Sequence, residues 1–239
     1  MLLISAFRIM PDRAFAAEEK NEKRHFIFLV HGIGGNKTHF GFMKEALWNV
    51  LNDEDDATSY IIRDFEYDTE NDEKKPFDFA KDFSRELESL LDRNKGINEN
   101  DKISLIMHSQ GGLIGSIWLF QSLNDNFDFS PQYVRHLDSF VTLATPFWGA
   151  KMALLGSAVS QLASYLHVNF DIPFGDRQLE EMSFGSDTIF EFREALLDDK
   201  QSKNFKFIKN NVRMLNIAAI AKALDLMALS QNLWVKIGY

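Results

Sequence analysis

The feature that most constrains this chain is a series of short apolar runs of strand length, separated by intervals with helical periodicity. The runs are His25–Val30, Ser59–Phe65, Lys102–Met107, Leu137–Ala144 and Val212–Ile217. Parallel strands need a crossover of a dozen or more residues between them, usually a helix, and their sheets are covered on both faces. The pattern therefore predicts an α/β fold, with a mostly parallel sheet and helices on both of its faces.

Helical spacing is clearest in three of the intervals. Apolar side chains recur with this spacing from Phe40 to Leu51, and another helix is expected over Gln110–Ser122. A further helix, which Pro76 or Asp78 can open, has the following predicted buried stripe: Phe79, Phe83, Leu87, Leu90 and Leu91. With 239 residues in total, the chain is long enough for one sizeable domain, which we assign to residues 17–239.

Composition excludes several classes of function. The chain has no cysteine, so thiol nucleophiles, Cys-ligated zinc, iron–sulfur clusters and disulfide scaffolds are excluded together. A net charge of −9 argues against nucleic acid as a partner. Ten acids and one base lie between Asn52 and Glu73, and carboxylates at such spacing indicate a solvated surface rather than a metal site. No metal and no organic cofactor is expected, and the sequence sets no oligomeric state.

The amino terminus has features of an export signal. Residues 1–7 are mostly apolar, and Ala14 and Ala16 stand at the −3 and −1 positions relative to Ala17, as a signal peptidase requires. Residues 1–16 are therefore interpreted as a signal peptide or a disordered leader. We expect a periplasmic or secreted protein, or a cytoplasmic one if the leader is not a signal.

The residues that most strongly indicate catalysis follow the run Lys102–Met107. The next residues are His108-Ser109-Gln110-Gly111-Gly112, followed by a helix, so a sharp strand-to-helix turn would expose the Ser109 hydroxyl above the sheet. Such a nucleophile elbow needs small residues two positions on either side of the serine. Gly111 satisfies this requirement, whereas Met107 departs from it. The alternative is that Ser109 is an ordinary helix N-cap.

A second glycine-rich turn would lie beside this elbow. His31-Gly32-Ile33-Gly34-Gly35 follows the first run, at the same edge of the predicted sheet. The backbone N–H groups of Ile33 and Gln110 could then hold a developing oxyanion at the start of a helix. Phosphate binding is the alternative for this turn, although it lacks the usual spacing and has only Lys37 as a basic partner.

These motifs together resemble a known family. HGIGG, HSQGG and VTLATPFWGA, in this order and spacing, are similar to the lipase and esterase branch of the α/β-hydrolases, over about residues 26–217. The resemblance implies that Ser109 is the nucleophile and that Ile33 and Gln110 form the oxyanion hole. It also implies that His31 and His108 are neighbours in these motifs rather than the catalytic base, and that Phe147 forms an apolar wall.

The interval from about residue 150 to residue 211 is longer than one crossover requires. The resemblance and the uncharged, apolar segment Met152–Phe170 indicate a helical lid over an acyl-chain pocket, with transient contact to a lipid surface. A buried structural helix is the equal alternative. The same apolar character continues through these phenylalanines: Phe170, Phe174, Phe184, Phe190 and Phe192.

The family order places an acid and then a histidine after the serine. After Ser109 the histidines are His136, expected at the opposite end of the sheet, and His167 in the candidate lid, while Asp225 lies in a helical run. We therefore expect the triad acid and base beyond Tyr239, and a fold that is incomplete at its carboxyl end.

Two functions follow from this interpretation. The first is serine-dependent hydrolysis of carboxylic esters of apolar acyl groups, such as a lipid, through an acyl-enzyme. The sequence does not show whether water or another molecule accepts the acyl group from the enzyme. The second is a truncated, non-catalytic protein of this fold that binds a lipid or acyl ligand.

Overall fold

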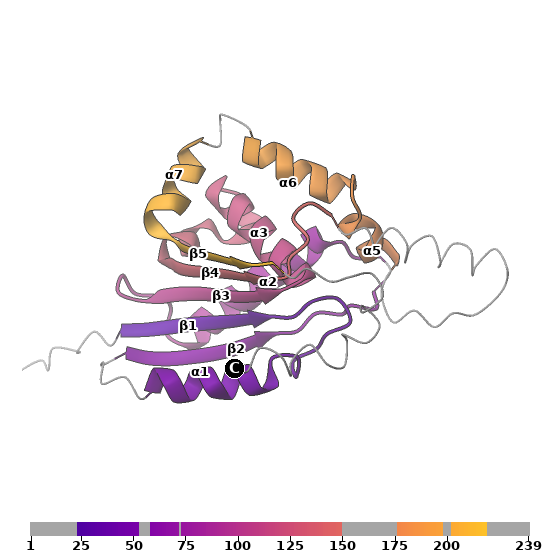
Figure 1. Cartoon of the computed structure of the whole chain (residues 1–239). Coiled ribbons are helices and arrows are strands. Elements are labelled where there is room, and N and C mark those ends of the chain that lie inside the picture. The colour runs from indigo at the N-terminus through magenta and orange to yellow at the C-terminus, as the bar shows by residue number, and fades with distance from the viewer. Residues whose placement is uncertain (1–22, 53–57, 72, 150–175, 198–201, 219–239) are drawn as a thin grey trace, which may run out of the picture.

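The fold is a single sheet of five parallel strands, seen in a computed structural model that describes residues 23–52, 58–71, 73–149, 176–197 and 202–218. The strands are β1 Lys23–Val30, β2 Thr58–Phe65, β3 Lys102–His108, β4 Leu137–Leu143 and β5 Arg213–Ile217. Their order across the sheet is β2-β1-β3-β4-β5, and all four pairings are parallel (Figure 1). Each of the five strands was predicted, with bounds that differ by one or two residues.

Helices fill the intervals between the strands. They are α1 Gly41–Asn52, α2 Pro76–Arg93, α3 Gln110–Leu123, α5 Asp176–Met182, α6 Asp187–Leu197 and α7 Ser202–Asn211, with two short 3-10 helices, η1 Phe127–Phe129 and η2 Pro131–His136. The two 3-10 turns were not predicted from the sequence. Pro76 is the first residue of α2, and the Asp78 carboxylate accepts a hydrogen bond from the Lys75 N–H, so both proposed starting residues contribute to this end.

The sheet has a hydrophobic core on each face. Alternate residues of β1 point in opposite directions: Phe26 and Phe28 belong to the core that contains α2 and α3, whereas Ile27 and Leu29 pack with residues of α1. The larger core includes the predicted stripe of α2, all five residues of which are buried, and the fully buried Trp118 of α3. The prediction of an α/β sheet covered on both faces is therefore confirmed.

A buried ion pair closes the end of the sheet where β1 begins. The Asp101 carboxylate, whose side chain is fully buried, accepts hydrogen bonds from the Arg24 guanidinium and from the backbone N–H groups of Arg24 and Asn98. The same guanidinium donates to the carbonyl oxygens of Asn94 and Gly96. Arg24 thus joins the start of β1 to the loop that connects α2 with β3.

Several sequence predictions concern residues outside those described. The leader at residues 1–16, the apolar segment Met152–Phe170 and the expected end at Tyr239 all belong to this group, so the signal peptide, the lid and the incomplete carboxyl end stay predictions. Within the interval from residue 150 to residue 211, the described parts form α5, α6 and α7. Among the helices that the structure describes, none combines the length and the apolar character needed to span a membrane.

Asp101→Ala should strongly destabilise the fold, because it leaves the Arg24 guanidinium without its partner in a largely buried position. We expect the free energy of unfolding, measured by urea denaturation, to fall by about 3–5 kcal/mol. Glu86→Ala, which removes the exposed pair with Arg93, is the matched control and should change it by less than about 1 kcal/mol. Similar losses for the two variants would contradict this role for Asp101.

Candidate active site

Ser109 occupies the sharp turn between β3 and α3. Its backbone has φ 51° and ψ −121°, a conformation that costs a non-glycine residue about 1–3 kcal/mol and persists only where the surroundings enforce it. The Ser109 N–H donates to the Leu143 carbonyl of the neighbouring strand β4, at 2.8 Å. Its side chain makes no capping hydrogen bond to α3. The ordinary N-cap alternative therefore does not describe this serine.

The turn can form only because its neighbours are glycines. A Cβ atom on Gly111 would lie 2.4 Å from the carbonyl oxygens of both Val30 and His31, where β1 ends. Backbone atoms cannot easily move away, so a side chain has no space here. The requirement for a small residue at this position, inferred from the sequence, has a direct steric cause in the close approach of β1.

Met107 does not obstruct the elbow, although its position was expected to need a small residue. Its side chain is fully buried in the larger core and points toward α3. A Cβ atom on Gly115 would lie 2.0 Å from the Met107 sulfur, so the space for the methionine is provided by a glycine on the helix. The departure from the family pattern is thus compensated by a glycine of α3, four residues after Gly111.

The second glycine-rich turn packs directly against Ser109. A Cβ atom on Gly32 would lie 2.7 Å from the Ser109 Cβ. The Gly32 carbonyl accepts hydrogen bonds from the Gly35 N–H and from the His31 ring, which fix the turn that carries Ile33. Within the described part of the chain, the N–H groups of Ile33 and Gln110 have no hydrogen-bond partner. Both predicted donors therefore stay available for an anion beside the serine.

Three histidines surround this turn, and burial lowers the pKa of each. His31 receives the Tyr67 N–H on Nε2, so its proton lies on Nδ1, which donates to the Gly32 carbonyl. The His39 Nε2 and the His108 Nδ1 lie 3.2 Å apart and share a hydrogen bond. Burial, followed by the nearby His39 and His31, lowers the pKa of His108 to about 4, and burial also lowers those of His31 and His39. All three rings are accordingly neutral at pH 7.

Tyr67, which the sequence motifs did not indicate, contacts both sides of the site. Its ring stacks on His31 with centroids 4.4 Å apart, and its hydroxyl lies 2.9 Å from the His31 carbonyl oxygen and 3.0 Å from the Gln110 side-chain oxygen. The motifs did not indicate His39 either. The signal that could have identified Tyr67 is its position two residues after the end of β2, at the sheet edge where the elbow and the glycine-rich turn were expected.

The loop after β4 joins the site to α5 and α6. Phe147 and Ile33 pack against an apolar cluster formed by Leu113, Leu179, Met182 and Ile189. This contact agrees with the apolar wall expected at Phe147. Gln178 of α5 is fully buried and donates to the carbonyl oxygens of Asp68 and Asn71, which fastens the helix to the loop after β2. In Figure 1, α5 lies beyond the arrowheads of the strands, on the side of the elbow.

Exposed aromatic side chains lie on this loop, on the turn between α5 and α6, and on α6. Trp148, Phe184 and Phe190 are each more than 60% exposed, and the Arg193 guanidinium lies over the Trp148 ring at 4.5 Å. Exposed aromatic residues of this kind are typical of surfaces that contact apolar ligands.

Of the two histidines that follow Ser109 in the sequence, neither of which is in the position expected for the base, the described residues include His136. His136 ends η2 at the opposite end of β4 and bonds the Asp101 carbonyl, as the sequence predicted. His167 and Asp225 lie outside the described residues. The identities of the triad acid and base therefore stay predictions.

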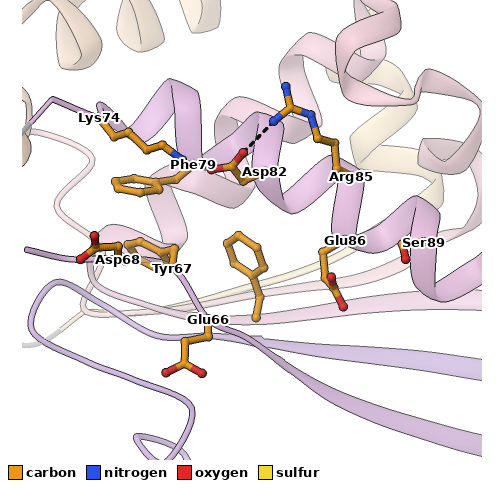
Figure 2. A pocket seen from close by; sticks show the side chains of 10 residues that line it. Glu66, Tyr67, Asp68, Lys74, Phe79, Asp82, Arg85, Glu86 and Ser89 are labelled. Atoms are coloured by element: carbon orange, nitrogen blue, oxygen red, sulfur yellow. Dashed lines mark hydrogen bonds and ion pairs between the residues drawn. The ribbon is translucent and has the colours of Figure 1, made fainter. Parts of the chain in front are cut away.

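Acidic residues after β2 line two surface pockets. One, of about 550 Å³, lies between the end of β2 and α2 and is lined by Glu66, Asp68, Glu86 and the aromatic residues Phe65, Tyr67 and Phe79 (Figure 2). The other adjoins Gly34 and Gly35 and shares Tyr67. Ser109 lines neither pocket, so the site is assigned from the geometry of the elbow and not from these cavities. Within the described residues, no cluster of three or more His, Asp or Glu is suited to hold a metal ion.

Comparisons with known proteins support the α/β-hydrolase fold and a family assignment. The family model described as "Putative serine esterase (DUF676)" matches residues 20–173. Phospholipase PlaB from Legionella pneumophila has 21% identity and a TM-score of 0.59 over 82% of this chain and 39% of that one. The mature lipase BlEst2 from Bacillus licheniformis has 18% identity and a TM-score of 0.51 over 90% and 75%.

These similarities establish the fold as that of the α/β-hydrolases. The chain spans about two fifths of the length of the phospholipase that it matches. A comparison with curated protein sequences finds no match.

Gly111→Ala should disrupt the elbow, because the new methyl group would meet two backbone carbonyl oxygens at 2.4 Å. We expect the free energy of unfolding to fall by about 1–3 kcal/mol or more, as measured by urea denaturation. Gly41→Ala is the matched control, since a Cβ atom there has no neighbour within 4 Å, and it should change stability by less than about 1 kcal/mol. An equal response of the two variants would refute the steric argument.

The neutral histidines should make stability depend on pH. The folded pKa of His108 is about 4 against 6.5 for the free side chain, so the unfolded chain binds more protons between these values. The free energy of unfolding should therefore decrease as pH falls from 6.5 toward 4. Above pH 6.5, His108 is neutral in both states and this loss is absent. Urea denaturation across this range should show a smaller decrease for His108→Gln than for the unmodified protein. Parallel profiles would contradict the assigned neutral state.

Proposed function

The chain belongs to the family described as "Putative serine esterase (DUF676)", and on this premise we propose that it hydrolyses carboxylic esters with Ser109 as the nucleophile. The observation that supports this assignment best is the backbone of Ser109. A non-glycine residue held at φ 51° between a strand and a helix, with Gly32 packed against it and Gly111 packed against the end of β1, matches the geometry of a nucleophile elbow.

The proposed reaction begins when the Ser109 oxygen attacks the carbonyl carbon of the ester. A general base takes the hydroxyl proton, and the carbonyl oxygen becomes an oxyanion. The N–H groups of Ile33 and Gln110 are suited to hold this oxyanion, because both lack other partners in the described part of the chain and one of them opens α3. The alcohol then leaves with the proton from the base, and water hydrolyses the resulting acyl-enzyme.

The general base and the acid that orients it are proposed to be a histidine and a carboxylate, in the order that the fold uses. Among the described residues, His31 is an unsuitable candidate because both of its ring nitrogens are occupied by Gly32 and Tyr67. His108 shares its Nδ1 with His39, and its pKa of about 4 makes it a weak base.

The proposed substrate is an ester with an apolar acyl group, such as a lipid. Ile33, which carries one oxyanion donor, contacts the apolar cluster around Leu113, and the exposed aromatic residues Trp148 and Phe184 lie on the neighbouring loop and helix turn. These surfaces favour an acyl chain over a charged group. Similarity of fold to a phospholipase and a lipase is consistent with this substrate class. Export by residues 1–16 stays a further proposal.

Ser109→Ala should abolish hydrolysis of p-nitrophenyl esters, because the attacking oxygen is lost. We expect kcat to fall by at least about 1000-fold, and a fluorophosphonate probe, which labels activated serines, should no longer attach. Ser89→Ala, an exposed serine on α2, is the matched control and should retain both turnover and labelling.

Circular dichroism and urea denaturation should show that all three proteins are folded. A folded, unmodified protein with neither turnover nor labelling would contradict the esterase and favour the alternative function, binding of an acyl ligand without chemistry. Labelling that survives in Ser109→Ala would place the nucleophile elsewhere.

A further inference from the structure

We propose that Tyr67 is a positioning residue that holds the two backbone donors of the oxyanion hole in a fixed relation to each other. This inference rests on the proposed function, because it concerns the same site. Tyr67 itself need not touch the substrate. Its role would be to join the turn that carries Ile33 to the elbow that carries Gln110.

The hydroxyl of Tyr67 bridges these two segments. It lies 2.9 Å from the carbonyl oxygen of His31, two residues before Ile33, and 3.0 Å from the side-chain oxygen of Gln110, the residue whose backbone N–H is the other donor. The hydroxyl has one proton and donates it to one of these two oxygens at a time. His31 and Gln110 are 36 and 43 residues from Tyr67 along the chain, respectively. One side chain therefore connects the ends of β1, β2 and β3 at the point where the oxyanion would form.

The ring of Tyr67 is itself held in place on several sides. It stacks on His31 at an interplanar angle of 2°, and it contacts Phe79 and Phe65 with centroid distances of 4.7 and 5.8 Å. Figure 2 shows Tyr67 facing Phe79 of α2 at the pocket beside the end of β2. The backbone N–H of Tyr67 also donates to the His31 ring. A rigid ring of this kind can transmit the position of α2 and the sheet to the hydroxyl.

Burial makes the hydroxyl contacts important. Tyr67, His31 and Gln110 are 7%, 1% and 0% exposed, so water cannot readily replace a lost hydrogen bond. The Gln110 amide nitrogen has no partner within the described residues, which leaves the Tyr67 hydroxyl as the contact that orients this side chain. Burial also raises the pKa of Tyr67 well above its usual value, so the hydroxyl keeps its proton at neutral pH.

The position of the two N–H donors affects the rate because an oxyanion hole stabilises the transition state with donors that are already in place before the charge develops. Removal of one donor typically lowers kcat by about 100- to 1000-fold. Tyr67→Phe leaves both donors in place and removes only their common support. The expected loss in kcat is therefore smaller, about 10- to 100-fold.

The test measures Tyr67→Phe on a p-nitrophenyl ester that the unmodified protein hydrolyses. We expect kcat to fall by about 10- to 100-fold with KM changed less than about twofold, because ground-state binding does not use the oxyanion. The inhibition constant of an alkyl boronate, which forms a tetrahedral adduct, should rise by a similar factor. Tyr133→Phe, at a buried tyrosine in η2, is the matched control and should keep both values.

A second variant, changed at the partner of Tyr67, distinguishes loss of this contact from a general loss of folding in Tyr67→Phe. Gln110→Met keeps the backbone donor and removes the side chain that Tyr67 contacts, and it should lower kcat by a similar factor. Because the two side chains act through one contact, the double variant should lose little more than either single variant.

The outcomes separate this inference from the proposed function. Unchanged kcat and boronate affinity in Tyr67→Phe, or losses that multiply in the double variant, would overturn the role of Tyr67 while the esterase stands. Failure of the unmodified protein to hydrolyse any ester would overturn the function itself. A loss confined to KM would also overturn the inference, because it would indicate a contact with the substrate instead.

Discussion

The close approach of β1 to the start of α3 is the constraint on which the rest of the site depends. The carbonyl oxygens of Val30 and His31 occupy the space that a side chain at position 111 would need. This contact is possible because β1 and β3 are neighbours in the sheet and end in register, with Val30 opposite Met107. It holds Ser109 in a conformation that an unsupported serine would leave. The fold thus supplies the strain that a nucleophile elbow requires.

The buried histidines around this contact are uncharged. His31, His39 and His108 are neutral at pH 7 because burial disfavours their protonated forms. Their hydrogen bonds go to the Gly32 carbonyl, to the Tyr67 N–H and to one another. With these rings neutral, none of them competes as a cation for the oxyanion that the backbone N–H groups of Ile33 and Gln110 are proposed to hold. The apolar cluster of α5 and α6 closes the same side of the site.

Much of the fold could be predicted because its signals are local. Apolar runs gave all five strands, and helical spacing gave the buried stripe of α2. The glycine-rich turns marked where Ser109 and Ile33 would lie. Contacts between distant elements could not be predicted in this way. Space for Met107 depends on Gly115 across the strand–helix interface, and Tyr67 acts on residues that are more than 30 positions away. The spacing of residues within one element carries no information about such pairs. The triad acid and base stay predictions because they are expected beyond Tyr239, outside the described residues.

The central claim is that Ser109 attacks the ester while Ile33 and Gln110 hold the oxyanion. A crystal structure of the protein after reaction with a phosphonate ester tests it most directly, because the bound phosphorus mimics the tetrahedral intermediate. We predict a covalent bond from phosphorus to the Ser109 Oγ, and one phosphoryl oxygen at about 2.7–3.1 Å from both backbone nitrogens. A phosphonate attached to another residue, or a phosphoryl oxygen directed away from both donors, would contradict the account.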